Sequence, residues 1–335
     1  MRILVTGVTG FVGSHLADAL VAGGGVEVFG VSRQADWPLG ADHLAQQVEM
    51  HVLDLCDRPG IEAVLRKVRP ERIYHLAGYP HVGQSIKEPE AAWTGNLQAT
   101  RSLYDAVLRW GGKPRILFVG SGLIYGDPET PGQAFNERSP LRPTTPYGVS
   151  KAAADLVSYQ YTRTGHLEIV RARPFNHVGP RQAPDFAVAH FARQIAAIAM
   201  LRQPPLLETG NLSPRRDLTD VRDVVRAYLL VMEKGRSGEA YNVGAGKSSS
   251  MLEIVERLLA IAKVRAEIRP RPDLMRANEV DEVLADANKL RTETGWAPSF
   301  PLDRTLADTL EYWRSLADVA APACATNGSE EKGVP

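Results

Sequence analysis

The sequence is short of cysteine, of long apolar runs and of net charge. Only two cysteines occur among 335 residues, Cys56 and Cys324, which excludes a disulfide framework and a thiolate metal site. No metal site is therefore predicted. No apolar run approaches the roughly 18 residues that a membrane-spanning helix needs, so no membrane association is expected. The apolar N-terminus, residues 1–16, is interrupted by Thr and Gly, and we interpret it as a first strand instead of a targeting segment.

The lack of net charge limits the partners. Lys and Arg together number 39, and Asp and Glu number 39, so the formal net charge is zero. A balanced chain has no overall field for nucleic acid, which is not an expected partner, although a local basic patch stays open. Hydrophobic residues make up 44% and charged residues 23%, close to globular averages, which excludes wholesale disorder. The composition fits a reducing cytosol, and we expect a cytoplasmic protein.

Short apolar runs alternate with helix-like segments through the first half of the chain. This alternation predicts an α/β fold, a Rossmann-type doubly wound parallel sheet covered by helices on both faces. The predicted strands are Arg2–Thr6, Val26–Val31, Val48–Leu53, Arg72–Leu76, Arg115–Val119 and Glu168–Arg173. The predicted helices are Gly13–Ala22, Ile61–Val68, Asn96–Arg109 and Tyr147–Tyr161.

The pattern changes after Phe175, where prolines punctuate irregular segments. Three further helices are predicted at Ala187–Leu201, Val221–Met232 and Met251–Ala262. A smaller mixed C-terminal substrate domain is therefore expected beside the sheet domain. We assign residues 1–178 and 215–245 to the sheet domain, 179–214 and 246–318 to the smaller domain, and 319–335 to a disordered polar tail.

A glycine-rich segment, Thr6–Gly13, lies between the first strand and the first helix. Its three glycines allow a sharp turn, the approach of a diphosphate and close packing of the helix on the sheet. The helix N-terminus offers free N–H groups and a partial positive charge to phosphate. The segment predicts dinucleotide binding by Gly7, Thr9, Gly10, Phe11, Val12 and Gly13.

The end of the second predicted strand indicates which dinucleotide is bound. An NAD site usually places an acid here to hold the ribose 2′-hydroxyl, but this chain has Ser32 and Arg33. Both side chains are candidates to contact a 2′-phosphate, so NADP(H) is favoured, with NAD(H) as the alternative; otherwise Arg33 is a solvated loop residue. Asp54, followed by Leu55, is a candidate to contact the adenine amino group, or else a turn residue.

Tyr147 and Lys151 stand four residues apart and share one face of a predicted helix. A tyrosine hydroxyl ordinarily has a pKa near 10, and a nearby ammonium lowers that pKa, which makes proton exchange feasible. Ser121 follows the fifth predicted strand, on the binding side of a parallel sheet. Its hydroxyl is a candidate to bond a substrate carbonyl, or else a plain turn serine.

Together these residues resemble the extended short-chain dehydrogenase/reductase superfamily, over residues 1 to about 316. The resemblance implies that Ser121, Tyr147 and Lys151 are catalytic and that Lys151 also holds the nicotinamide ribose. It implies that Asn96 supports the active-site backbone and that members act on nucleotide-activated sugars. It also implies a homodimer paired through helices Asn96–Arg109 and Tyr147–Tyr161. The further cofactor-site residues from its motifs are Leu76, Ala77 and Gly78.

Longer segments are similar to the GDP-mannose 4,6-dehydratases and the related GDP-4-keto-6-deoxy-D-mannose reductases. They are Arg173–Gln182, Arg216–Tyr228, Arg276–Val280 and Gly295–Pro298. The dehydratases keep an acid two residues after the catalytic Ser or Thr, where this chain has Leu123. The resemblance therefore implies an NADPH-dependent reductase that forms GDP-D-rhamnose. A 4-epimerase with bound NAD is the alternative, ahead of a dehydratase or a non-catalytic NADP-binding protein.

The same resemblance implies a set of residues that bind a GDP-linked sugar. They are Ser85, Ser121, Asn176, His177, Asn211, Arg216, Arg276 and Glu279. Planar guanidinium groups suit phosphate geometry, which makes Arg216 and Arg276 candidates for the diphosphate. Structural alternatives stay open, namely an ion pair of these arginines with Asp217 or Glu279, and a loop role for His177.

Overall fold

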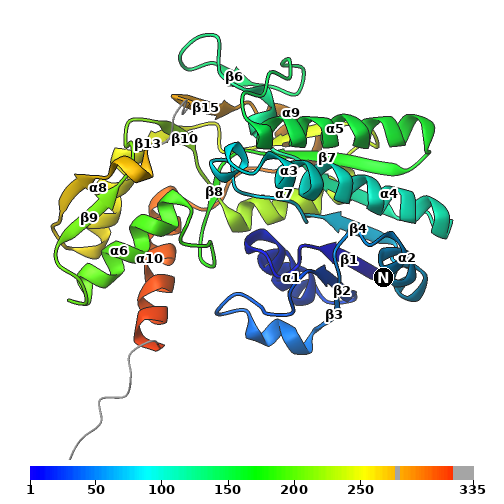
Figure 1. Ribbon diagram of the computed structural model, residues 1–335, viewed down its shortest axis with the longest axis horizontal. Coiled ribbons are helices and arrows are strands. Elements are labelled where there is room, and N and C mark those ends of the chain that lie inside the picture. The colour runs from blue at the N-terminus through cyan, green and yellow to red at the C-terminus, as the bar shows by residue number, and fades with distance from the viewer. Residues whose placement is uncertain (276–279, 320–335) are drawn as a thin grey trace, which may run out of the picture.

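The computed structural model describes residues 1–275 and 280–319. It consists of a large lobe built around one sheet and a smaller lobe that contains β9, α6, α8 and α10 (Figure 1). Of the predicted disordered tail, 319–335, residues 320–335 lie outside the described residues, whereas Val319 is the last residue of α10 (Leu302–Val319). The chain begins in the large lobe, at the first residues of the sheet.

The large lobe is organised by a seven-stranded sheet in which every neighbouring pair is parallel. Its strands are β1 (Arg2–Thr6), β2 (Glu27–Ser32), β3 (Val48–Val52), β4 (Arg72–His75), β5 (Arg115–Val119), β7 (Glu168–Pro174) and β12 (Ala240–Val243). The spatial order β12-β7-β5-β4-β1-β2-β3 reverses direction between β1 and β4. Ligands of doubly wound sheets bind at this switch point, outside the carboxyl ends of the strands.

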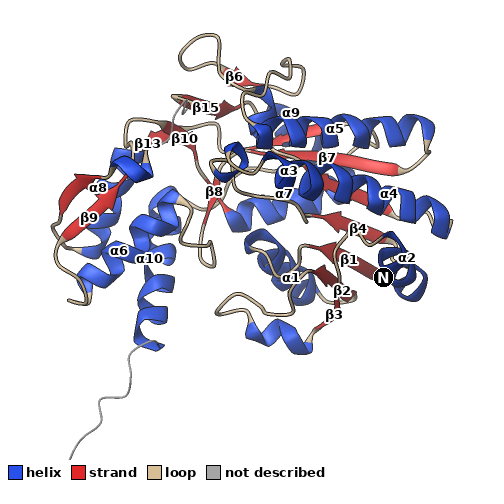
Figure 2. Ribbon diagram, viewed as in Figure 1, coloured by secondary structure: helices blue, strands red, loops and turns tan. Residues whose placement is uncertain are grey.

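Helices cover both faces of this sheet, as Figure 2 shows. One face packs on α1 (Phe11–Gly23), α7 (Val221–Lys234) and α9 (Asn288–Thr294), and the other on α2 (Arg58–Val68), α4 (Ala99–Trp110) and α5 (Pro146–Thr164). Successive strand residues serve opposite faces, so Ile73 and Tyr74 of β4 enter different apolar clusters. The predicted Rossmann-type doubly wound sheet is confirmed.

Local sequence signals set several helix ends. Thr145 precedes α5 and its side chain accepts a hydrogen bond from the Gly148 N–H at 3.1 Å, while Pro146 occupies the first turn. Ser250 and Glu253 form a reciprocal capping box at the start of α8 (Met251–Ala262). That helix has the predicted bounds, because its start is specified by residues adjacent in sequence.

The smaller lobe packs α6 (Ala187–Ala199), α8 and α10 around their own apolar cluster, beside the parallel pair β9 (Leu206–Thr209) and β14 (Glu267–Pro270). A four-stranded sheet joins β13 (Ser248–Ser250), β10 (Arg215–Asp217), β15 (Glu282–Ala285) and β6 (Ala134–Phe135). A parallel pair, β8 (His177–Val178) and β11 (Thr219–Asp220), completes the strands. Because β6 comes from the first half of the chain, the four-stranded sheet crosses the proposed domain boundaries, which stay a prediction.

One strand of the large sheet escaped the sequence analysis. Residues Ala240–Val243 form β12, which pairs with β7 at the edge of the sheet. Four residues are too few to show a periodic pattern, and the partner strand lies far away in sequence.

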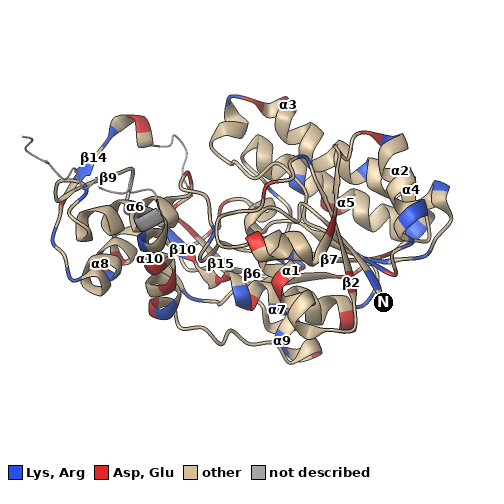
Figure 3. Cartoon of the chain, turned by 90° about the horizontal axis from the view of Figure 1, so that it is seen from below, with Lys and Arg blue, Asp and Glu red and all other residues tan. Residues whose placement is uncertain are grey.

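Across residues 1–275 and 280–319, no helix is long and apolar enough to cross a membrane. Cationic and anionic residues are interspersed over both lobes (Figure 3).

Candidate active site

The turn after β1 has the geometry of a phosphate cradle. Gly7 has φ +71, and a Cβ there would lie 2.9 Å from backbone atoms of Ala77. A Cβ on Gly13 would lie 2.1 Å from the Gly7 carbonyl oxygen, so the first turn of α1 can approach the sheet only as glycine. Gly10 caps α1 without any side-chain hydrogen bond. The helix therefore presents its N-terminal N–H groups without a side-chain acceptor, as an anion site requires.

The candidates for the adenosine end meet at the carboxyl ends of β2 and β3. Thr9 Oγ1 and Ser32 Oγ are hydrogen-bonded at 2.6 Å, which ties the phosphate loop to the end of β2. Arg33 is exposed beside them. Asp54 is also exposed, and its Oδ1 accepts the Cys56 N–H at 2.8 Å in a turn. The turn role and the adenine role of Asp54 do not exclude each other, since the side chain is exposed.

The remaining predicted cofactor residues are buried or half-buried. Leu55 is buried in the apolar cluster beneath β2. Leu76 and Ala77 are half-buried just after β4, and the Ala77 N–H donates to Thr6 Oγ1 at 3.2 Å. A Cβ on Gly78 would lie 2.6 Å from Asn96 Oδ1 and 3.1 Å from Lys151 Nζ. Leu76, Ala77 and Gly78 thus run from the phosphate loop to the catalytic helix.

Ser121 and Tyr147 approach each other from different elements. Ser121 precedes the 3₁₀ turn η4 (Gly122–Tyr125), and its Oγ accepts the Leu123 N–H at 3.2 Å. Tyr147 lies in the first turn of α5 and is 9% exposed. Burial raises the pKa of the Tyr147 hydroxyl, and a hydrogen bond from Ser121 acts in the opposite direction. Ser121 therefore supplies the described contact that favours the phenolate.

Lys151 lies one turn further along α5 and is nearly buried. Its Nζ donates to the Val119 carbonyl oxygen at 3.1 Å and lies 5.9 Å from the centre of the Phe118 ring. Burial lowers the pKa of Lys151 to about 8. The predicted effect of Lys151 on the Tyr147 pKa stays a prediction, since the described hydrogen bond of the ammonium goes to the end of β5.

Asn96 lies in a π-helical segment, Trp93–Gln98, that leads into α4. Its Oδ1 accepts the Tyr79 N–H at 2.9 Å, and its Nδ2 donates to Ser150 Oγ at 3.0 Å. Ser150 Oγ in turn donates to the Tyr147 carbonyl oxygen at 2.8 Å. Asn96 thus connects the segment that follows β4 with helix α5. This is the kind of backbone support that the resemblance implies. Irregular π turns of this kind often occur at functional sites.

Two predicted substrate residues lie near this centre and one is buried beneath it. Asn176 is exposed after β7, and His177 stacks on the ring of Phe11 with centroids 5.8 Å apart. Burial lowers the pKa of His177, whose Nδ1 contacts the Phe175 carbonyl oxygen at 3.0 Å. Ser85 has no exposed surface; its Oγ donates to the Val82 carbonyl oxygen at 2.6 Å and accepts the Tyr147 N–H at 3.2 Å. The described contacts give Ser85 a supporting position under α5.

The other predicted substrate residues lie further out. Asn211 is exposed, and its Oδ1 accepts hydrogen bonds from the N–H and Oγ of Ser213 at 3.0 and 2.9 Å. Arg216 Nη1 donates to the carbonyl oxygens of Arg215 and Val280, both at 2.8 Å. Arg276 and Glu279 lie outside the described residues. In residues 1–275 and 280–319, no group of three His, Cys, Asp or Glu side chains could hold a metal ion.

The sequence analysis missed a buried ionic cluster behind the site. Asp155 of α5 is completely buried and pairs with Arg171 and Arg173 of β7. Arg173 appeared only as part of a longer segment of the resemblance. The available signal was weak, since an acid inside a helix and arginines inside an apolar strand show no pairing until the sheet assembles.

Comparison with known proteins identifies the relatives of this arrangement. The sequence profile of the GDP-mannose 4,6 dehydratase family matches residues 4–309. GDP-6-deoxy-D-mannose reductase of Pseudomonas aeruginosa is 33% identical over 314 residues, which span 94% of this chain and 97% of the relative. The chain is therefore similar to this relative along almost the whole length of both proteins.

Solved structures are also similar to this fold over almost their whole length. The structure of RMD from Pseudomonas aeruginosa complexed with NADPH has a TM-score of 0.81 at 32% identity, covering 94% of this chain and 99% of that one. Thermus thermophilus UDP-glucose 4-epimerase in complex with NAD has a TM-score of 0.84 at 29% identity, with the same coverage of 94% and 99%. The same fold thus carries both a reductase-type and an epimerase-type site.

Proposed function

This chain belongs to the GDP-mannose 4,6-dehydratase family of extended short-chain dehydrogenases/reductases, and we propose that it reduces the C4 ketone of a GDP-4-keto-6-deoxyhexose with NADPH. The expected conversion is GDP-4-keto-6-deoxy-D-mannose to GDP-D-rhamnose. The observation that carries the proposal is Leu123 in a site that otherwise holds Ser121, Tyr147 and Lys151. The full-length similarity to a GDP-6-deoxy-D-mannose reductase supports it.

The described residues fit a dinucleotide phosphate cofactor. The glycine cradle at Gly7 and Gly13 excludes side chains where a diphosphate would approach, and α1 begins without a side-chain cap. Ser32 and the exposed Arg33 stand at the end of β2 without a neighbouring acid in that strand end, which favours NADP(H) over NAD(H). The relative crystallised with NADPH supports the same preference, and the relative crystallised with NAD keeps NAD(H) as the alternative.

When bound, NADPH supplies the hydride that reaches C4 of the sugar. The chain supplies the proton and the orientation. Ser121 would donate a hydrogen bond to the C4 carbonyl oxygen and hold it beside Tyr147. The Tyr147 hydroxyl would transfer its proton to O4 as the alkoxide develops. Lys151 would hold the nicotinamide ribose through its ammonium, which lies at the end of β5.

The residue at position 123 separates a reductase from a dehydratase. Elimination of water across C5 and C6 needs a base that removes the C5 proton. Leu123 carries no ionisable group and packs against the apolar cluster of Ile124, Tyr125 and Phe135. Gly122, its neighbour, has no room for a side chain, because a Cβ there would lie 2.8 Å from the Phe175 ring. Reduction of the C4 ketone needs no such base, because no proton is removed from C5.

The test is to follow NADPH absorbance with enzymatically prepared GDP-4-keto-6-deoxy-D-mannose. Consumption of NADPH with formation of a rhamnose-configured GDP-sugar supports the reductase. Interconversion of nucleotide hexoses at C4, without net NADPH use and with NAD retained through purification, would replace it with the 4-epimerase. The similarity to a UDP-glucose 4-epimerase structure makes that second function the one to exclude.

A homodimer and a cytoplasmic location belong to the same proposal. Large apolar side chains are exposed on α4 and α5, the two helices that the resemblance pairs between subunits. They are Leu108 (43% exposed), Val149 (37%), Leu156 (56%) and Tyr159 (45%). Such a patch is typical of a protein interface. The smaller domain, residues 179–214 and 246–318, is proposed to bind the GDP-linked sugar. The scarcity of cysteine supports the location.

A further inference from the structure

A fully buried carboxylate lies on the catalytic helix. Asp155 follows Lys151 by four residues and Tyr147 by eight, so it lies one and two turns further along α5. Its exposed fraction is 0%. A charge in such a place is stable only with charged partners and saturated hydrogen bonds.

Two arginines of β7 supply those partners. Arg171 Nη1 lies 2.5 Å from Asp155 Oδ1. Arg173 donates from Nη2 to Oδ1 at 2.8 Å and from Nε to Oδ2 at 3.0 Å, so its planar group grips both carboxylate oxygens. Burial by itself lowers the pKa of Arg173, but its hydrogen bonds and charge contacts with Asp155 outweigh burial and raise it. These hydrogen bonds fasten α5 to β7.

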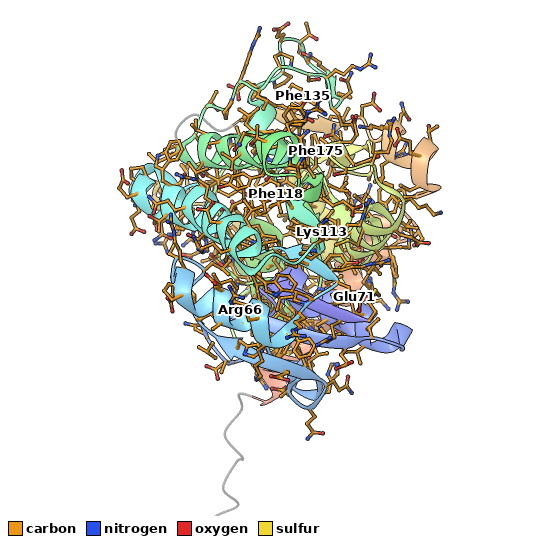
Figure 4. All side chains as sticks on the ribbon, turned by 90° about the vertical axis from the view of Figure 1, so that its right-hand side faces the viewer. Arg66, Glu71, Lys113, Phe118, Phe135 and Phe175 are labelled. Carbon is orange, nitrogen blue, oxygen red and sulfur yellow. The ribbon has the colours of Figure 1, made fainter. Side chains whose placement is uncertain are left out.

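Arg173 uses its remaining nitrogen for a second element. Its Nη1 donates to the Tyr125 hydroxyl oxygen at 2.9 Å, and that hydroxyl donates to Asn242 Oδ1 at 2.7 Å. Tyr125 is the last residue of η4, the turn that begins at Ser121. Its ring is stacked between Phe135, at 5.2 Å, and Phe175, at 6.2 Å. Figure 4 shows Phe118, Phe175 and Phe135 in succession from the sheet toward β6.

The three residues therefore link the two elements that carry the reacting hydroxyls. Tyr147 comes from α5, which Asp155 anchors, and Ser121 comes from the turn that Tyr125 ends. Arg173 contacts both anchors at once. A lysine could not do this, because a single ammonium lacks the fork that grips a carboxylate in two places and a hydroxyl in a third.

We propose that Asp155, Arg173 and Tyr125 are positioning residues that hold the Ser121 hydroxyl against the Tyr147 hydroxyl. This inference rests on the proposed reductase for its kinetic tests. None of the three needs to touch the substrate. Their effect passes through the Ser121–Tyr147 hydrogen bond, whose loss would leave burial to raise the Tyr147 pKa unopposed.

Tyr125→Phe is the mildest test, because it keeps the stacked ring and removes only the hydroxyl. We expect kcat to fall about tenfold, within the roughly 100-fold that a misplacement of about 1 Å produces, with an unchanged KM for NADPH. The alkaline limb of the kcat–pH profile should shift to higher pH, because the proton donor Tyr147 acquires a higher pKa. Arg173→Lys should behave in the same way with a larger loss of kcat.

The matched control is Tyr104→Phe. Tyr104 is completely buried on α4, and its hydroxyl is hydrogen-bonded at 2.8 Å to Ser158 of α5, outside the proposed network. This change removes one buried hydroxyl contact to the same helix. It is expected to lower the melting temperature while leaving kcat and the pH profile unchanged.

A double-mutant cycle with Ser121→Ala decides whether the effect passes through Ser121. If it does, Tyr125→Phe costs much less in a Ser121→Ala background than in the wild type. Full additivity of the two losses would overturn the inference. Equal losses of kcat in Tyr125→Phe and Tyr104→Phe would also overturn it, since they would indicate general loosening of α5.

A titration without substrate keeps the two proposals separate. Tyrosinate absorbance, taken as the difference between each protein and its Tyr147→Phe counterpart, reports the Tyr147 pKa directly. A higher pKa in Tyr125→Phe than in the wild type supports the inference even if the wild type consumes no NADPH, which would refute only the proposed function. An identical pKa in both proteins would refute the inference, whatever the enzyme's substrate.

Discussion

Lys151 Nζ donates a hydrogen bond of 3.1 Å to the carbonyl oxygen of Val119, the last residue of β5. Two residues beyond Val119 the chain reaches Ser121, so the ammonium lies beside the end of the strand that precedes the proposed catalytic serine. The ammonium is almost fully buried there, and its pKa is lowered to about 8. Burial of this charge costs stability, which leads to the first prediction.

Lys151→Met is expected to inactivate the enzyme and to stabilise the fold at neutral pH. The folded-state pKa of about 8 lies below the ordinary 10.5, so the unfolded chain binds the proton more strongly. At pH 7 this mismatch amounts to about 3 kcal/mol, or a few degrees in melting temperature. Wild-type stability should recover as pH rises from 8 to 10.5, and the gap between the two proteins should close. Melting curves across that range are the measurement; a less stable variant at pH 7 would contradict it.

Tyr147→Phe is expected to lower kcat by about 100- to 10,000-fold, the usual contribution of a positioned proton donor. The ring stays in place, so NADPH affinity should change little. Stopped-flow turnover and fluorescence titration with NADPH separate the two quantities. Full turnover in this variant would remove Tyr147 from the mechanism.

Arg33→Ala is expected to raise the KM for NADPH about tenfold and to leave the KM for NADH unchanged, because only NADPH carries the 2′-phosphate that a guanidinium would bind. Lys113→Ala is the matched control. Lys113 is an exposed cation just before β5, at the opposite edge of the sheet from the carboxyl ends. Equal effects of Arg33→Ala on the KM values for both cofactors would show that Arg33 does not bind the 2′-phosphate.

His75→Asn is expected to make the protein less sensitive to acid. His75 is buried between Thr6 Oγ1 and Thr100 Oγ1, at 2.8 and 2.9 Å, and burial lowers its pKa from 6.5 to about 3. Between pH 6.5 and about 3, the His75 imidazole is protonated in the unfolded chain but stays neutral in the folded protein. The free energy of unfolding therefore falls as pH drops from 6.5 toward 3. Urea unfolding at several pH values measures the slope in both proteins. Identical slopes would show that His75 is not the group responsible.

Leu156→Asp is expected to convert the proposed dimer into a monomer, because it places a charge in the exposed apolar patch of α4 and α5. Leu252→Asp is the control, since Leu252 is 41% exposed on α8 in the smaller lobe, against 56% for Leu156. Light scattering on a sizing column gives the mass. A monomeric wild type, or a dimer that survives Leu156→Asp, would refute the interface.

Much of the fold was readable from local signals. The strand Arg115–Val119 and the helix Met251–Ala262 have the predicted bounds, and α5 extends its prediction by only a few residues at either end. These elements carry their information in neighbouring residues, as apolar runs, caps and a helix-starting proline. The phosphate loop was equally legible, since its glycines act within one turn of the chain.

The partners of buried polar groups were not readable in this way. The Ser85 hydroxyl donates to the Val82 carbonyl oxygen and accepts the Tyr147 N–H, two contacts that the sequence did not indicate, while its contact with the substrate stays a prediction. Asp155 gave no signal at all, because its arginines belong to a strand that contacts α5 only in the folded sheet. Residues distant in sequence and adjacent in space leave no periodic trace.

The sequence by itself determined the alternation of strands and helices and the glycine-rich turn after the first strand, because each depends on residues within a few positions of one another. Tertiary structure alone decided that β12 completes the sheet, that Lys151 turns to Val119, and that Arg173 links Asp155 to Tyr125. Those arrangements are set by the strand order of the sheet. It brings together segments that are separated by tens of residues, and burial then favours a hydrogen-bond partner for the polar groups among them.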